Sequence, residues 1–277
     1  MFSFLSFILL FFIGILTGLF SGLFGGGGGI ITNPLIWSVF SYMDFPSQVV
    51  VQITFGTTVA SMMITAILGS CVHHHHKNIW WEVIPPLVTG GMLGSLIGAT
   101  AASYSPGVFL KVSFGFLQLI VAYFMIANKK LSSSSSEDPI KRWEYILLLG
   151  LGIGFIGSFM GIGGGAIAVP IMVLLLRYPM DKTAGISCTM IAFNSTVATM
   201  AYIYNGWGND YLPPYSLGYV NGVALMILIS SSLIFVTFGA SRVRRIKSQI
   251  LQRIFGFILI ISGIKIVFSN LINLIYS

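Results

Sequence analysis

The chain has 277 residues, of which 56% are hydrophobic and only 8% are charged, and its formal net charge is +7. Soluble domains carry about 25% charged residues, so this composition excludes an ordinary soluble enzyme or binding domain. A helix of about 20 apolar residues crosses a bilayer, whereas a β-barrel needs short alternating segments. The sequence therefore predicts an all-α polytopic membrane protein of the plasma membrane, or of the inner membrane in a bacterium.

Apolar length, glycine, proline and charge divide the chain into a series of predicted membrane segments. The first of them lacks a basic start and a cleavage site, so we interpret it as a membrane segment, not as a signal peptide. We expect about eight to ten membrane segments in all, because two of the predicted segments are short for a crossing. The predicted segments are 3–24, 29–43, 49–70, 82–102, 106–127, 145–160, 166–178, 183–204, 216–239 and 250–269.

A polar linker separates two halves of the chain. Residues 128–144 read "NKKLSSSSSEDPIKRWE", a composition typical of a flexible tether. We predict an N-terminal repeat at 1–127 and a C-terminal repeat at 145–277. The two cysteines, Cys71 and Cys188, lie inside or beside apolar segments and do not indicate a disulfide framework.

The two halves contain similar landmarks in the same order. The stretch "GLFGGGGGIITNP" (22–34) aligns with "SFMGIGGGAIAVP" (158–170) at a shift of 136 residues, without a gap. A shift of 129 aligns Gly56 with Gly185, and a shift of 141 aligns "LKVSFGF" (110–116) with "LQRIFGF" (251–257). Three collinear matches favour an internal duplication.

The distribution of charge predicts how the halves are related, because Lys and Arg mark cytoplasmic loops. Basic residues cluster in the linker 128–144, in the loop 240–249 and around 177–182, but are absent from 41–48, 102–107 and 205–216. If each segment pair around a glycine cluster enters the membrane and returns, or crosses twice, every basic loop lies inside. The halves then form inverted repeats, an architecture of transporters, and both termini are predicted outside.

The glycine clusters are predicted to break their helices at membrane depth, because glycine disfavours helix interiors. Such a break is tolerated only inside protein or beside a watered cavity, and the next helix begins with free N–H groups that attract anions. The alternative is that the glycines only permit close helix packing. Without a following Gly-Lys-Ser/Thr, a nucleotide loop is disfavoured. The predicted anion-binding glycines are Gly27, Gly28, Gly29, Gly163, Gly164 and Gly165.

Polar residues inside the segments 49–70 and 183–204 offer further donors to an oxyanion. Their hydroxyl and amide groups recur at helical spacing on one face of each segment. The alternative is that they form hydrogen bonds between helices. The candidates for substrate binding are Thr57, Thr58, Thr65, Ser187 and Asn194.

Charged side chains are absent from the middle of the predicted segments, which argues against a carboxylate-relay pump or a channel with acidic rings. Lys111 and Arg253 lie near segment starts, where we expect them to snorkel to the membrane surface. The histidines form one run, His73–His76, which we interpret as a basic cap; a metal site there is the alternative. We expect no catalytic residues and no enzyme, because no histidine lies in the membrane core.

The same residues resemble the TauE/SafE family, also called sulfite exporters or the toluenesulfonate uptake permease family. "GLFGGGGGIITNPLI" and "GSFMGIGGGAIAVPIMVL" are similar to its two glycine-proline signatures, and "FGTT", "VHHHHKNIWW" and "SLGYVNG" to further landmarks. The resemblance implies a transporter with inverted repeats, generally for sulfur-containing anions. The four-His run, Lys77 and Ile186 depart from the family pattern, so the resemblance does not identify the substrate.

We therefore expect a secondary transporter that moves a small sulfur-containing anion, such as sulfite or a sulfonate, by alternating access. The alternatives are a passive anion channel, a transporter of a non-sulfur organic anion, and a non-transporting membrane partner or redox module. The expected partners are the anion and the lipid bilayer, with a proton or another ion for coupling; no nucleic acid, cofactor or metal is expected. The anion, the direction of transport and the oligomeric state are not indicated.

Overall fold

Helices make up nearly all of the chain that the computed structural model describes, namely residues 4–24, 28–127, 142–176, 178–242, 256–257 and 259–268. One short antiparallel pair of strands, Ser216–Leu217 (β1) and Val220–Asn221 (β2), accompanies them. The helices are Phe4–Phe24 (α1), Gly29–Tyr42 (α2), Val50–His75 (α3), the 3-10 turn Trp81–Val83 (η1), Ile84–Tyr104 (α4), Gly107–Ala127 (α5), Trp143–Phe159 (α6), Gly165–Leu174 (α7), Met180–Gly206 (α8), Gly222–Arg242 (α9) and Leu259–Phe268.

Five helical stretches in the described chain are long and apolar enough to cross a membrane. Shorter apolar helical stretches accompany them, namely Trp143–Phe159 (α6), Gly222–Thr237 within α9, and Leu259–Phe268. Many large apolar side chains on the long helices are exposed, as expected of surfaces that face lipid. These features make the chain a multi-pass helical membrane protein. The five stretches are Phe4–Gly22, Val50–His75, Trp81–Tyr104, Gly107–Phe124 and Lys182–Gly206.

Some predicted boundaries were wrong. The helix expected at 216–239 begins only at Gly222, because residues 216–221 form the strand pair and the Asn221 Oδ1 atom accepts a hydrogen bond from the Ala224 N–H (3.0 Å). The helix expected at 166–178 ends at Leu174. The helix expected at 49–70 continues to His75, so three of the four histidines are helical.

The ends of the linker and of the last segment also differ from the prediction. Residues 143–144, expected in the linker, belong to α6. Residues 128–141 of the linker and residues 243–255 lie outside the described part of the chain. The last expected segment, 250–269, is therefore described mainly by the helix Leu259–Phe268.

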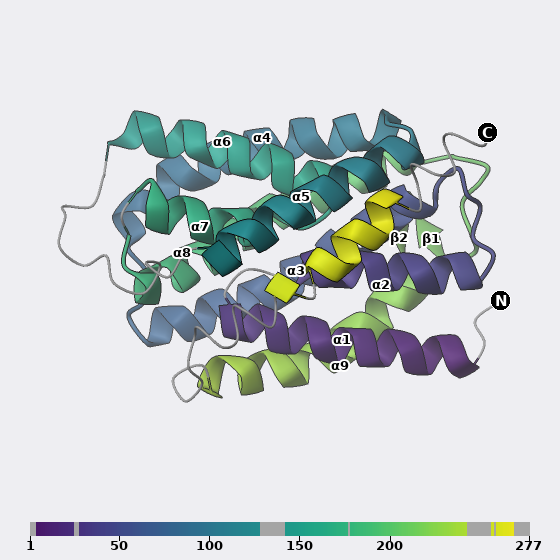
Figure 1. Cartoon of the computed structure of the whole chain (residues 1–277), viewed down its shortest axis with the longest axis horizontal. Coiled ribbons are helices and arrows are strands. Elements are labelled where there is room, and N and C mark those ends of the chain that lie inside the picture. The colour runs from purple at the N-terminus through teal and green to yellow at the C-terminus, as the bar shows by residue number, and fades with distance from the viewer. Residues whose placement is uncertain are drawn as a thin grey trace.

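The helices lie along the long axis of the molecule, and matching helices of the two halves run in opposite directions (Figure 1). Helix α1 runs from the right-hand end of Figure 1 to the left, whereas α6 runs from left to right. The start of α1 and the end of Leu259–Phe268 both lie at the right-hand end, while α5 ends and α6 begins toward the left.

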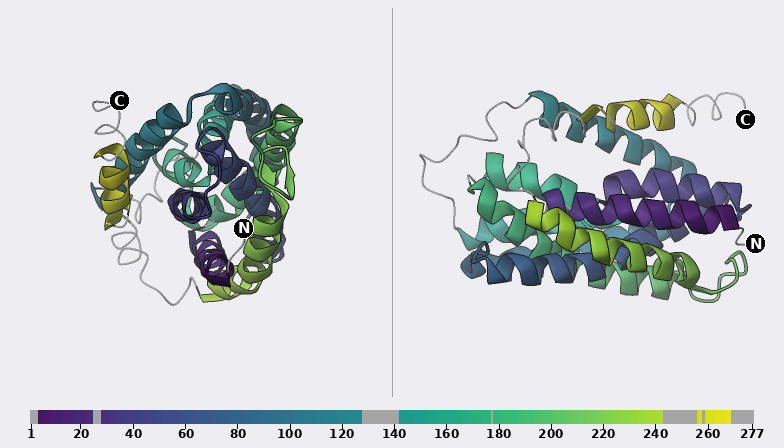
Figure 2. Two further views of the ribbon diagram at one scale, coloured as in Figure 1. Left: turned by 90° about the vertical axis from the view of Figure 1, so that its right-hand side faces the viewer. Right: turned by 90° about the horizontal axis from the view of Figure 1, so that it is seen from below.

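The contacts between helices form matching sets. Helix α4 packs along α6, and α3 packs against α8. Helix α1 packs along α9, as the right-hand view of Figure 2 shows. Glycines bring the backbones together at these contacts: a Cβ at Gly94 would overlap the Leu151 carbonyl oxygen, and one at Gly18 would overlap the Ser232 carbonyl oxygen. Small residues that permit such close approach are typical of helix pairs in membranes.

Replacing Gly154 by leucine tests this packing, because a Cβ there would overlap the carbonyl oxygen of Gly91 on α4. Overpacking of this kind costs about 1–3 kcal/mol, so we expect Gly154→Leu to lower the melting temperature of the purified protein by several degrees. Gly152→Leu on the same helix is the control, because nothing lies within 4 Å of its Cβ position. Equal melting temperatures for the two variants would contradict the packing described above.

Candidate functional site

The two glycine clusters break their helices, and the two breaks touch. Helix α1 ends at Phe24 and α2 begins at Gly29; α6 ends at Phe159 and α7 begins at Gly165. A Cβ at Gly29 would lie 2.9 Å from the Ile162 Cα and 3.3 Å from the Gly161 carbonyl oxygen. The start of α2 therefore lies directly against the backbone of the second break.

The second break begins with a Schellman motif at the end of α6. The Ile162 N–H donates to the Gly157 carbonyl (2.7 Å) and the Gly161 N–H donates to the Ser158 carbonyl (3.2 Å), with Gly161 at a φ of 65°. This hydrogen-bond pattern is the usual way in which a helix ends at a left-handed glycine. The motif satisfies carbonyl groups that a broken helix would otherwise leave bare in the membrane.

Asn33 on α2 binds two more carbonyl groups of the second break. Its Nδ2 atom donates to the carbonyl oxygens of Met160 (2.9 Å) and Gly161 (3.0 Å). Asn33 is buried, and because both partners are carbonyls, its amide nitrogen must face them and its oxygen must face away. The Oδ1 atom of Asn33 has no hydrogen-bond partner among the described residues.

The second break leaves hydrogen-bond donors free at the start of α7. Gly163 and Gly164 have φ values of 63° and 91°, and the N–H groups of Gly163, Gly164 and Gly165 donate to no acceptor in the described part of the chain. A Cβ at Gly163 would lie 2.7 Å from the Ser195 Oγ atom, which is buried and unpartnered there as well. Successive free amides at a helix start are a common anion-binding arrangement.

The first break is built differently. Gly28 precedes α2 with a φ of −61°, and its carbonyl accepts hydrogen bonds from the N–H groups of Ile31 and Thr32 (both 3.0 Å). Pro34 has no N–H, so the Ile30 carbonyl lacks its helical partner, and the Gln118 Nε2 atom of α5 donates to it instead (2.8 Å). Gly27, predicted as a site residue, lies outside the described residues.

Helix α3 places a polar face beside both breaks. Phe55 lies against the Cβ position of Gly161, while the Met62 Sδ atom lies 2.8 Å from that of Gly29. Thr58 lies between Phe55 and Met62 at helical spacing, and its buried hydroxyl has no partner in the described chain. Thr58 is therefore a free donor on the face of α3 that meets the breaks.

Helix α8 places matching groups beside the second break. Ile191 Cγ2 lies 3.1 Å from the Cβ position of Gly163, and Met190 Cε lies 3.5 Å from that of Gly164. Ser187 and Asn194 flank these two residues at helical spacing, and the polar atoms of both side chains are buried without a partner in the described residues. The Asn194 carboxamide lies against the Cβ position of Gly91 on α4.

The other two predicted side chains already have hydrogen-bond partners. The Thr57 Oγ1 atom accepts a hydrogen bond from the Asn221 N–H (3.0 Å). The Thr65 Oγ1 atom donates to carbonyls of its own helix, those of Ser61 (3.3 Å) and Met62 (3.2 Å). These contacts fit the alternative reading of Thr57 and Thr65, in which they bond within or between structural elements.

The breaks and the facing surfaces of α3 and α8 together offer amide, hydroxyl and carboxamide groups but no carboxylate among the described residues that contact them. No group of three or more His, Cys, Asp or Glu side chains that could hold a metal ion occurs in the part of the chain that the structure describes. Neutral hydrogen-bond donors in apolar surroundings suit a small anion that has lost its hydration shell.

The family model described as Sulfite exporter TauE/SafE matches residues 10–266. The chain belongs to the TauE/SafE family. It is therefore a membrane transporter of that family, not an enzyme.

Relatives of this TauE/SafE protein are transporters by name. A probable membrane transporter protein of Haemophilus influenzae is 29% identical over 271 residues, covering 96% of this chain and 98% of the relative. Probable membrane transporter proteins of Methanocaldococcus jannaschii and Bacillus subtilis are 27% and 21% identical, covering 80% and 97% of this chain and 80% and 100% of their own lengths. No solved structure matches the chain.

Several residues at the breaks of this TauE/SafE chain were not among the site residues predicted from the sequence. Asn33 is the most important, and the repeat alignment hid it because a shift of 136 pairs it with Val169. A polar residue directly before the proline of a broken helix was the signal available. Phe55 and Met62 gave no signal, because apolar residues on a membrane helix are most often packing residues.

The histidine run, where this chain departs from the TauE/SafE pattern, lies at the left-hand end of Figure 1, away from the breaks. The ring of His74 packs edge-on against that of Trp81, with the ring centres 5.4 Å apart. The ring centres of His75 and His76 are 5.8 Å apart. The nearby Lys182 Nζ atom donates to the Lys77 carbonyl (2.8 Å), which links α8 to the end of α3.

Replacing Asn33 by leucine tests its contact with the second break. The carbonyls of Met160 and Gly161 would lose the Nδ2 donor, and a buried group left without its partner costs about 1–3 kcal/mol. We expect Asn33→Leu to lower the melting temperature clearly. Thr89→Leu is the control, because Thr89 is exposed and its hydroxyl donates to carbonyls of its own helix, those of Pro85 (2.9 Å) and Pro86 (3.1 Å). A melting temperature for Asn33→Leu no lower than that of Thr89→Leu would refute the contact.

Proposed function

We propose that this TauE/SafE protein is a secondary transporter that carries a small sulfur-containing anion, such as sulfite or an organosulfonate, by alternating access around the two broken helices. The observation that carries the proposal is the set of free N–H groups of Gly163, Gly164 and Gly165 beside the unpartnered Ser195 hydroxyl. Such a set replaces the water around an anion without the cost of burying a full positive charge.

The substrate class is supported by chemistry and by the family description, Sulfite exporter TauE/SafE. Sulfite and sulfonates carry several acceptor oxygens around one sulfur atom, and these would take hydrogen bonds from the amides of α7 and from the hydroxyls of Thr58, Ser187 and Ser195. Unpartnered polar groups at this depth are expensive unless a ligand or water fills them.

Inverted repeats are the architecture that we propose for the two halves, 1–127 and 145–277. The opposite directions of α1 and α6 support it (Figure 1), and so do the paired contacts of α4 with α6 and of α1 with α9. Loops without Lys or Arg gather at the right-hand end of Figure 1, so we place that end, and both termini, outside the cell.

Two glycines support alternating access, because they occupy matching positions at opposite ends of the molecule. A Cβ at Gly56 on α3 would overlap the Tyr219 carbonyl oxygen of the loop before α9, and one at Gly185 on α8 would overlap the Asn78 carbonyl oxygen of the loop before α4. Each loop thus lies against the helix of the other half, and we propose that the loops close the two ends in turn.

Sulfite protection against heat tests the binding site. We expect sulfite to raise the melting temperature of the purified protein, and Thr58→Val or Ser187→Ala to raise the half-maximal sulfite concentration about tenfold, since each removes a donor to a charged ligand. Thr65→Val is the control, because the Thr65 hydroxyl is already bonded to its own helix. Hydroxyl deletions are more informative than Gly164→Val, because Gly164 has a φ of 91° and valine would strain the backbone there.

Thiosulfate, sulfonates, sulfate and carboxylates in the same assay define the substrate class. Absence of protection by any sulfur anion would refute the proposed function, whereas protection that survives in both hydroxyl variants would refute only the site. Flux that saturates and is stimulated by sulfite on the opposite side indicates a carrier; single-channel currents would show a channel instead.

Gly56→Ala and Gly185→Ala test the two loops. The added methyl group displaces the loop at the right-hand end in the first variant and at the left-hand end in the second. In a chain without Cys71 and Cys188, the substitution Thr58→Cys provides one thiol for labelling with an impermeant maleimide. We expect this thiol to react faster from one side of the membrane in Gly56→Ala and from the opposite side in Gly185→Ala. Gly152→Ala is the control. Identical labelling from the same side would contradict alternating closure.

A further inference from the structure

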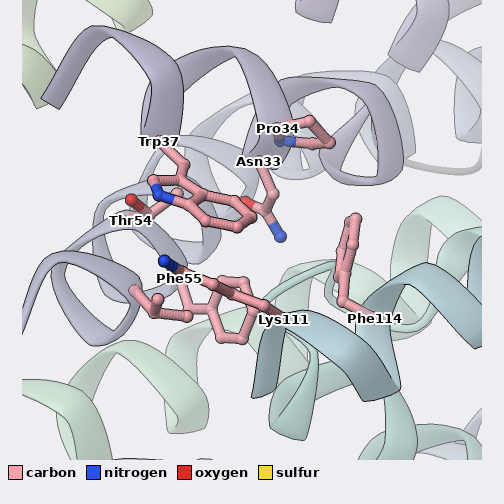
Figure 3. A pocket seen from close by; sticks show the side chains of 8 residues that line it. Asn33, Pro34, Trp37, Thr54, Phe55, Lys111 and Phe114 are labelled. Carbon is pink, nitrogen blue, oxygen red and sulfur yellow. The ribbon is translucent and has the colours of Figure 1, made fainter. Parts of the chain in front are cut away.

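A second cluster of residues lies beside the breaks, in a pocket between α2, α3 and α5 (Figure 3). It lies toward the right-hand end of the molecule, because α5 begins at that end and Lys111 is four residues after its first residue, Gly107. In the present conformation the pocket has room for about one water molecule. Its lining residues are Asn33, Pro34, Trp37, Val51, Thr54, Phe55, Lys111 and Phe114.

Lys111 brings a positive charge into this pocket. The sequence favoured snorkelling to the membrane surface, but the Lys111 side chain is half-buried and its Nζ atom lies 3.9 Å from the centre of the Trp37 ring. No acidic side chain pairs with it in the described part of the chain. An aromatic ring offsets only part of the cost of removing an ammonium group from water. A bound anion would therefore stabilise the Lys111 ammonium group further.

Two residues that line the pocket also contact the second break. Asn33 donates its Nδ2 protons to the Met160 and Gly161 carbonyls, and Phe55 lies against the Cβ position of Gly161. Both residues also line the pocket. The pocket therefore adjoins the backbone of Met160 and Gly161, where the second break begins.

The surroundings make Lys111 unusual at this end of the molecule. The loops 41–48, 102–107 and 205–216 contain no Lys or Arg, and Lys265, the other lysine in a described helix near this end, is exposed. Exposed charges are screened by water and salt, while a half-buried charge in an apolar pocket is screened much less. Lys111 thus dominates the local attraction for anions.

We propose that Lys111, Trp37 and Asn33 form a second anion site, which a singly charged oxyanion occupies on its way between the right-hand end and the broken helices. The inference rests on the proposed anion transport. Lys111 supplies the charge, Trp37 covers the ammonium group, and the unpartnered Asn33 Oδ1 atom accepts a hydrogen bond from a water that accompanies the anion. Because the pocket holds about one water here, the anion occupies it when α2 and α5 move apart.

Quenching of Trp37 fluorescence tests the site without requiring transport. Iodide is an anionic quencher and acrylamide a neutral one, and the Trp37 component in the full chain is found by comparison with Trp37→Phe. We expect Lys111→Met to reduce iodide quenching of Trp37 several-fold while acrylamide quenching is unchanged. Lys265→Met is the matched control, and iodide should quench its Trp37 fluorescence as strongly as in the wild type. Unchanged iodide quenching in Lys111→Met would overturn the proposal.

Sulfite uptake into proteoliposomes tests whether the site serves transport. We expect Lys111→Met to raise the KM for sulfite about tenfold with a smaller change in kcat, as loss of a binding charge requires. Lys111→Arg should restore most of the affinity, which also controls for misfolding of the methionine variant. A normal KM in correctly folded Lys111→Met would overturn the second site but not the proposed function. Absence of saturable sulfite flux in the wild type would refute the proposed function, and the iodide experiment would still decide whether the pocket attracts anions.

Discussion

The bilayer contains no water to satisfy exposed backbone, so every carbonyl and amide of a broken helix needs a partner inside the protein. The second break meets part of this requirement: the Schellman motif covers the Gly157 and Ser158 carbonyls, and the Asn33 side chain covers those of Met160 and Gly161. Its amide side remains open in the described chain. In the described chain four carbonyls of the break are thus bonded while the N–H groups of Gly163, Gly164 and Gly165 are not, and the proposed site depends on that difference.

The two breaks satisfy the same constraint by different means. In the first, a hydroxyl pair between Thr17 and Thr32 (2.7 Å) and the Gln118 amide hold the backbone of α2. In the second, three glycines at positive φ make the turn themselves. The two breaks are therefore built differently, although each leaves the N–H group that begins the next helix, that of Gly29 or Gly165, without an acceptor in the described residues.

The sequence predicted the helix breaks, most helix positions and the buried polar faces of α3 and α8, because glycine clusters and hydrophobic length act locally. It could not predict the Ser216–Asn221 strand pair, since two-residue strands have no periodic signal. Asn33 and Lys111 were missed for another reason: their meaning depends on which carbonyl groups, and which tryptophan ring, lie against them from elements distant in the chain. The assignment of inverted repeats and of membrane orientation stays a prediction.

Asn33 joins the start of the chain to carbonyls 127 and 128 residues away, so it connects the two halves. Side-chain hydrogen bonds inside membranes contribute about 0.6 kcal/mol each on average. Two of them contribute about 1.2 kcal/mol, about twice the thermal energy RT. A contact of that strength holds α2 against the second break, yet it can be exchanged for a hydrogen bond to water at little cost if the two separate.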